Sequence, residues 1–174
     1  MPSIHVTSLA DAPRIASTIG ASHLVSLLRL EQQPPTPPSI AAVNHLRVDI
    51  NDITAAADGL VHPQSDHVAE LIAFARGWNR SRPMLVHCFA GISRSTAAAY
   101  ISACAVLPAA DPLELALALR RASPTASPNM LLIEHADDLL AANGRMIEAI
   151  ETIGRGELAM SCSPFCLRLS ELGG

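Results

Sequence analysis

Residues 87–95 of the chain read HCFAGISRS, so five residues separate Cys88 from Arg94. The apolar run before them, Pro83 to His87, predicts a short strand. The alanine-rich run that begins at about Arg94 predicts a helix that is apolar on nearly every side, which is typical of a buried helix. This nine-residue segment is therefore expected to form a loop between a strand and the start of a buried helix.

Such a loop is suited to binding an anion. Backbone N–H groups between a strand and a helix N-terminus converge on one point, at the positive end of the helix dipole, and this arrangement fits a phosphate dianion. It also favours the thiolate form of a cysteine. Arg94 adds a planar charged fork for two phosphate oxygens, and Gly91 lets the backbone turn. The expected phosphate-binding residues are Phe89, Ala90, Gly91, Ile92, Ser93 and Arg94.

The rest of the chain predicts an α/β fold. Strands are expected at Ser3–Val6, in the first part of Ser22–Leu30, at His45–Val48 and before the loop just described. Helices are expected to begin near Asp11, Ser65, Arg94, Asp111 and Ser127, with Gly144 ending the helix that Ser127-Pro128 opens and a last helix following it. Strands separated by helices indicate a mostly parallel central sheet of about four to five strands flanked by helices. Residues 1–160 are expected to form one domain, and residues 161–174 an irregular tail.

Composition narrows the classes of partner and location. The 174 residues carry a net charge of −4, which argues against a nucleic acid or an anionic membrane held by bulk charge. We expect no membrane span, because no apolar stretch reaches the ~20 residues that a bilayer requires. The N-terminal residues lack the pattern of a secretory signal, so a reducing cytoplasm is expected, with the four cysteines as thiols. A redox or metal role for Cys162 and Cys166 stays open.

The segment HCFAGISRS resembles the His-Cys-x5-Arg-Ser/Thr signature of the protein tyrosine phosphatase superfamily. The size and layout resemble its compact, dual-specificity-like branch, and residues 22–142 are similar to small bacterial tyrosine-phosphatase-like proteins. The resemblance implies that residues 1–160 form a catalytic domain. It implies a mechanism without metal or cofactor, in which the Cys88 thiolate attacks phosphorus and forms a phosphocysteine, stabilised by Arg94 and the loop amides. Ser95 is expected to help the sulfur depart, and His87 to order the loop.

The resemblance also implies a general acid on a loop some 30 to 40 positions before the cysteine. Asp52 and Asp49 both qualify, and Asp52 is preferred because it lies further into the loop, with Asp58 and Asp66 as more remote alternatives. Asn129 matches an asparagine that the family uses to brace the signature loop, although a role at a helix start explains it nearly as well.

The predicted activity is hydrolysis of a phosphate monoester on a phosphorylated protein or a small phosphoester. Positions 89–93 carry no Lys or Arg to meet additional phosphates, which favours phosphotyrosine. Alternatives are a pseudophosphatase that binds phosphoproteins without turnover, and a rhodanese-like sulfurtransferase or arsenate reductase. The sequence leaves the choice between tyrosine-only and dual specificity, and the oligomeric state, open.

Overall fold

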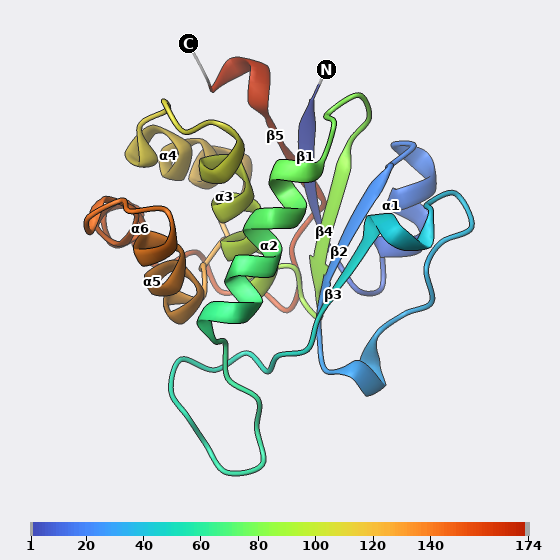
Figure 1. The fold of residues 1–174 in the computed structure, drawn as a ribbon, viewed down its shortest axis with the longest axis horizontal. Coiled ribbons are helices and arrows are strands. Elements are labelled where there is room, and N and C mark those ends of the chain that lie inside the picture. Colours follow the sequence, from blue (N-terminus) through green and yellow to red (C-terminus); the bar gives the residue numbers. More distant parts are fainter. Residues whose placement is uncertain (1, 173–174) are drawn as a thin grey trace.

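The computed structural model describes residues 2–172, which form a central sheet with helices on both faces (Figure 1). The strand order is β3-β2-β4-β1-β5, in which neighbouring strands are parallel except for the antiparallel pair β1 and β5. The strands are β1 (Ser3–Ser8), β2 (His23–Leu27), β3 (His45–Val48), β4 (Met84–Cys88) and β5 (Phe165–Arg168). The predicted α/β class and mostly parallel sheet are confirmed.

Helix α1 (Ala12–Thr18) covers one face of the sheet and the longer helices cover the other (Figure 1). These are α2 (Ser65–Gly77), α3 (Arg94–Val106), α4 (Pro112–Ala122), α5 (Met130–Leu139) and α6 (Arg145–Ile153), and short 3-10 turns occur at Leu30–Gln32, Ala42–Asn44 and Leu169–Glu171. Each face has its own apolar cluster: a small one around Ile15 and Leu85 under α1, and the main core around Val86 and Ile101.

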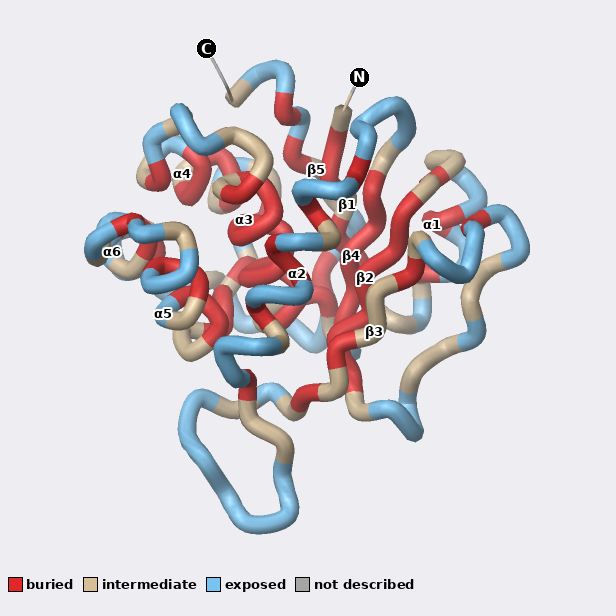
Figure 2. Tube along the Cα trace, viewed as in Figure 1, coloured by how far each residue is buried: buried red, intermediate tan, exposed pale blue. Residues whose placement is uncertain are grey.

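Strand β4 lies at the centre of the sheet, between β1 and β2. All its residues are buried, and nearly every residue of the following α3 is buried as well, as the sequence predicted (Figure 2). Such a sheet places ligands at the carboxyl ends of its strands, near the point where chain connections leave on opposite faces. The loop after β4 therefore occupies the position in this fold where a ligand site is expected.

The prediction of an irregular tail over residues 161–174 is wrong for residues 165–171. Strand β5 adds to the sheet edge beside β1, with Leu167 opposite Ile4, and the short turn Leu169–Glu171 follows it. Leu167 and Leu169 are both 3% exposed. Their burial against the main core explains the strand, because alternate apolar residues on a short segment stabilise an edge strand even when its neighbours are polar.

Two helix boundaries also differ from the prediction. Helix α5 begins at Met130 instead of at Ser127-Pro128, because the Asn129 side chain accepts a hydrogen bond from Leu132 N and caps the helix there. Gly144 does not end α5, which stops at Leu139; it precedes α6, with φ of 85°. Asp137 accepts hydrogen bonds from Gly144 N and Met146 N and so links the two helices.

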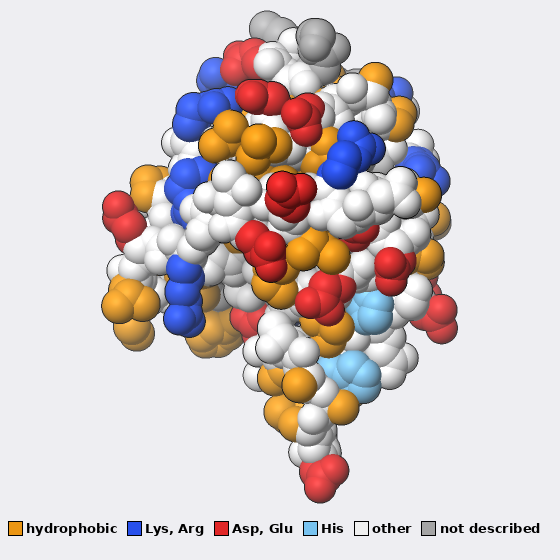
Figure 3. Space-filling model, turned by 90° about the vertical axis from the view of Figure 1, so that its left-hand side faces the viewer, with side chains coloured by type: hydrophobic (Ala, Val, Ile, Leu, Met, Phe, Trp, Pro, Cys, Tyr) orange, Lys and Arg blue, Asp and Glu red, His pale blue; other side chains and the backbone are white. Residues whose placement is uncertain are grey.

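The segment between β3 and α2 is mostly exposed and projects from the body of the molecule (Figures 2 and 3). Acidic, basic and apolar side chains are interspersed on the face drawn in Figure 3. None of the helices within residues 2–172 is long and apolar enough to cross a bilayer.

Candidate active site

The segment 88–94 curves at the carboxyl end of β4, and its carbonyl groups point outward. Leu9 N donates to Phe89 O (3.1 Å), Cys162 N to Ala90 O (2.9 Å), and Ser127 N to Ile92 O (3.0 Å). Asn129 N donates to Ser93 O (3.4 Å). In a trans peptide unit the N–H points away from the C=O. The N–H groups of Ala90, Gly91, Ser93 and Arg94 therefore point toward the inside of the loop.

Cys88 lies on the inner side of this loop. Its Sγ accepts a hydrogen bond from Gly91 N (3.3 Å) and lies 3.2 Å from Ser95 Oγ. The side chain is 1% exposed. A thiolate at this point would be stabilised by the inward N–H groups and by the N-terminus of α3. The structure thus brings Cys88 and Ser95 together as the resemblance implied.

Arg94, the first residue of α3, is buried with its guanidinium beside the same loop. One guanidinium nitrogen, Nη1, donates to Ile50 O (3.0 Å), and Nε lies 3.8 Å from Asp52 Oδ2. Nε has no hydrogen-bond partner within the described part of the chain. A buried donor without a partner is costly. A phosphate oxygen would supply the acceptor that this nitrogen lacks.

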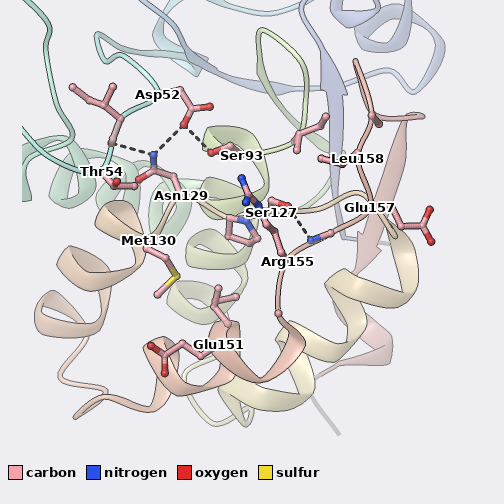
Figure 4. A pocket seen from close by; sticks show the side chains of 17 residues that line it. Asp52, Thr54, Ser93, Ser127, Asn129, Met130, Glu151, Arg155, Glu157 and Leu158 are labelled. Atoms are coloured by element: carbon pink, nitrogen blue, oxygen red, sulfur yellow. Dashed lines mark hydrogen bonds between the residues drawn. The ribbon is translucent and has the colours of Figure 1, made fainter.

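The two candidate acids have different surroundings. Asp52 lies over the signature loop, where Oδ1 accepts hydrogen bonds from Ser93 Oγ (2.7 Å) and Asn129 Nδ2 (3.0 Å) (Figure 4). Asp49 faces away: its Oδ1 accepts from Leu30 N (3.1 Å) and pairs with Arg29 (3.2 Å). The geometry thus places Asp52, and not Asp49, next to Arg94.

Asn129 fills the helix-start role and also braces the loop that follows β3, while its backbone N–H bonds to the signature loop. Its side-chain oxygen caps α5, and its amide nitrogen donates to Asp52 Oδ1 and to Ile53 O (3.2 Å). It therefore connects the loop that follows β3 to the start of α5. Ser93, expected only as a phosphate-binding residue, also contacts Asp52, a role that sequence reasoning missed because the two residues are 41 positions apart.

Gly91 is required by close packing behind the loop. Its φ is 75°, and a Cβ at this position would overlap Cys162 Sγ and lie 2.8 Å from the Thr7 carbonyl carbon. Cys162 is buried, and burial raises the pKa of its thiol to about 11. Cys162 thus contacts the candidate site from the C-terminal part of the chain, whereas Cys166 lies on β5, and both are free thiols.

A chain of hydrogen bonds runs from Thr36 through three buried side chains to the backbone at the start of the signature loop. Thr36 Oγ1 lies 2.8 Å from His45 Nδ1, His45 Nε2 lies 2.8 Å from Ser26 Oγ, and Ser26 Oγ lies 2.6 Å from His87 Nε2. His87 Nδ1 approaches Cys88 O at 3.4 Å. Burial lowers the pKa of both histidines to about 4. Two neutral imidazoles, each donating once and accepting once, satisfy every link, so His87 orients the loop backbone.

The remaining loop residues differ in exposure. Phe89 is 65% exposed at the edge of the site, whereas Ala90, Ile92 and Ser93 are partly buried. Within residues 2–172 there is no group of three or more His, Cys, Asp or Glu side chains arranged to hold a metal ion.

Comparison with known proteins agrees with this geometry. The family described as protein-tyrosine phosphatase matches residues 44–122, which contain Asp52, β4 and the signature loop. No curated protein sequence matches the chain at a significant level.

Similar folds occur among solved structures. The structure of DUSP15 is 22% identical, with 88% of this chain and 91% of that chain covered and a TM-score of 0.59. Human DUSP28 is 26% identical, with coverage of 82% and 94% and a TM-score of 0.58. A mouse putative dual specificity phosphatase, solved with zinc tungstate, is 24% identical, with 80% of each chain covered and a TM-score of 0.53.

Residues 44–122 thus match the protein-tyrosine phosphatase family, and the chain has the fold of compact dual specificity phosphatases. These findings support a phosphatase.

Proposed function

We propose that this chain hydrolyses phosphate monoesters through a phosphocysteine on Cys88. The observation that carries the proposal is the position of Cys88 Sγ inside a loop whose carbonyls point outward, 3.2 Å from Ser95 Oγ. A phosphate in this loop would meet inward N–H groups and the Arg94 guanidinium, and its phosphorus would face the sulfur.

In the first step, the Cys88 thiolate forms an S–P bond while the P–O bond to the leaving group breaks. Asp52, in its protonated form, gives its proton to the leaving oxygen. For this, the Asp52 carboxyl must turn from Ser93 and Asn129, to which it is hydrogen-bonded here, toward the leaving group.

In the second step, a water attacks phosphorus and Asp52 takes a proton from it. The S–P bond breaks, and inorganic phosphate and the Cys88 thiolate result. The Ser95 hydroxyl, next to Sγ, donates a hydrogen bond that stabilises the departing sulfur. The same carboxyl group thus acts as the acid in the first step and as the base in the second. After both steps the enzyme is back in its starting state.

The preferred substrate class is phosphotyrosine on a protein. Loop positions 89–93 contain no cation to meet additional phosphates on an inositol ring. The exposed Phe89 ring lies at the edge of the site, where it suits contact with an aryl group. We further propose a cytoplasmic location and no nucleic-acid or membrane partner, supported by the net charge of −4 and the four free cysteines.

The test is hydrolysis of a generic aryl phosphate by the wild type, Cys88→Ser and Asp52→Ala, each with and without a chelator. The proposal predicts turnover that resists the chelator and is abolished in Cys88→Ser. Binding of a phosphotyrosine peptide without turnover of any phosphoester would instead identify a phosphoprotein-binding module. Sulfur transfer from thiosulfate to cyanide would identify a sulfurtransferase.

A further inference from the structure

A cavity of about 630 Å³ opens directly beside the signature loop, and apart from Asp52 its lining residues take no part in bond cleavage in the mechanism above. The loop that follows β3 contributes Asp52 and Ile53, and the signature loop contributes Ile92 and Ser93. The opposite wall is the connection between α6 and β5, residues 154–164, which contributes Gly154 to Ala159. A substrate bound by phosphate in the signature loop would therefore extend along this cavity.

The connection 154–164 is held in place at several points. Arg120 Nη2 donates to Gly154 O (2.8 Å), Gly156 N donates to Ser127 Oγ (2.9 Å), and Glu157 N donates to Pro124 O (3.0 Å). A Cβ on Gly156 would lie 2.5 Å from the Thr125 carbonyl. Cys162 N also donates a hydrogen bond to Ala90 O, so the connection forms a fixed wall.

Arg155 projects from this wall into the cavity, toward Ser93 (Figure 4). It is exposed and makes no hydrogen bond or ion pair with any residue from 2 to 172. Three carboxylates also line the cavity. Of these, Asp52 accepts hydrogen bonds from Ser93 and Asn129, and Glu151 and Glu157 point away from Ser93 (Figure 4). Arg155 is the one cation among the residues that line the cavity, and it is not paired with any of these carboxylates within residues 2–172.

We propose that Arg155 binds a second anionic group of the substrate, close in the polypeptide to the phosphorylated residue. The group is a carboxylate of an acidic side chain or a second phosphate, both of which match a guanidinium fork. This inference rests on the proposed function for the phosphate held by Arg94. Ile53 and Met130, which are partly buried, contribute apolar lining to the same cavity, whereas Arg155 itself is exposed, so salt is expected to screen the pair. Arg155 is accordingly a residue that determines specificity and takes no part in bond cleavage.

The experiment compares kcat/KM for four phosphotyrosine peptides that differ only in the residues flanking the phosphotyrosine. The flanking residues are Asp and Glu in the acidic peptide, Asn and Gln in the amide peptide, Lys in the Lys peptide, and a second phosphorylated residue in the doubly phosphorylated peptide. The enzymes are the wild type, Arg155→Ala and Arg155→Glu. Arg121→Ala is the matched control, because Arg121 is also exposed and without a partner within residues 2–172 but lines a different groove, between α4 and β5.

For the wild type, kcat/KM is expected to be about fivefold higher with the acidic or the doubly phosphorylated peptide than with the amide peptide. This preference should fall as ionic strength rises. Arg155→Ala should remove this preference, Arg155→Glu should reverse it in favour of the Lys peptide, and Arg121→Ala should retain it. The second anion is identified by whichever peptide, acidic or doubly phosphorylated, has the higher kcat/KM relative to the amide peptide. No preference in the wild type, or the same preference in Arg155→Ala, would overturn the inference.

Binding separates this inference from the proposed function. In the Cys88→Ser background, fluorescence anisotropy of the labelled peptides measures affinity without turnover. If the wild type hydrolyses no phosphoester but the acidic peptide still binds more weakly after Arg155→Ala, the proposed function fails and the Arg155 contact stands. If the wild type hydrolyses phosphoesters but peptide binding does not depend on Arg155, the proposed function stands and the Arg155 contact is wrong.

Discussion

At the scale of single residues, Asp49 and Asp52 differ in their contacts rather than in their chemistry. Asp52 lies 3.8 Å from Arg94 Nε, and Asp49 pairs with Arg29. Asp52→Ala is expected to lower kcat by about 10²–10⁴-fold for a substrate with a poor leaving group, and by less for an activated aryl phosphate that needs no proton. Steady-state kinetics with both substrates measures the difference.

Asp49→Ala is the control for that prediction. It removes a carboxylate of the same loop without touching Arg94, so kcat should stay near the wild-type value. Full activity in Asp52→Ala together with loss in Asp49→Ala would reverse the assignment of the acid.

The sequence predicted the residues whose roles depend on local order. Cys88, Gly91, Arg94 and Ser95 lie within eight positions of one another, so a strand before them and a helix after them suffice to bring them together. Arg155 and Cys162 could not be found in this way. The contact of Cys162 with the signature loop, and the position of Arg155 beside it, depend on how the chain returns after α6, which no local pattern encodes.

At the scale of structural elements, the signature loop depends on Gly91. Gly91→Ala combines the cost of a positive φ with overlap against Thr7 and Cys162, and should lower kcat/KM by about tenfold or more. Gly59→Ala is the matched control: its φ is 73°, but nothing lies within 4 Å of the added Cβ. Equal activity in the two variants would show that packing behind the loop is unimportant.

The hydrogen-bonded histidines predict a dependence of stability on pH. His45 and His87 have a pKa of about 4 when folded and 6.5 ordinarily, because burial disfavours their charged forms. The unfolded chain thus binds more protons between these values. The free energy of unfolding should be constant above about pH 7 and fall below pH 6.5, by about 1.4 kcal/mol per pH unit for each histidine.

Urea denaturation at several pH values between 4 and 7.5 measures this slope. His45→Gln should reduce the slope of the free energy of unfolding against pH by the contribution of one histidine. His62→Gln, in the loop before α2, removes a histidine outside the network and should leave the slope unchanged. An unchanged slope in His45→Gln would contradict the assignment of neutral, buried imidazoles.

At the scale of the whole molecule, the C-terminal segment is part of the core. Leu167 on β5 is 3% exposed, whereas Leu158 in the connection 154–164 is 97% exposed. Leu167→Ala should lower the free energy of unfolding by about 2–5 kcal/mol, and Leu158→Ala by about 0.5 kcal/mol or less. Chemical denaturation of both variants tests this. Equal stabilities would mean that β5 does not pack as described.

The fold class was predictable because the long segments carry their own signal, α2 through its helical periodicity and α3 through its continuous run of alanine and apolar residues. Strand β5 was not predictable, since it has only four residues, too few for the alternation of Leu167 and Leu169 to stand out from its polar neighbours. Its conformation is set by pairing with β1, at the opposite end of the chain, and by burial of Leu167.

The proposed mechanism requires that the phosphate group be carried by Cys88. The direct measurement is mass spectrometry of Ser95→Ala, quenched in acid during turnover of an aryl phosphate, because loss of the serine next to Sγ should slow departure of the sulfur. The predicted result is a phosphate group on the peptide that contains Cys88, absent when Cys88→Ser is added. Phosphate on another residue, or hydrolysis that persists in Cys88→Ser, would contradict it.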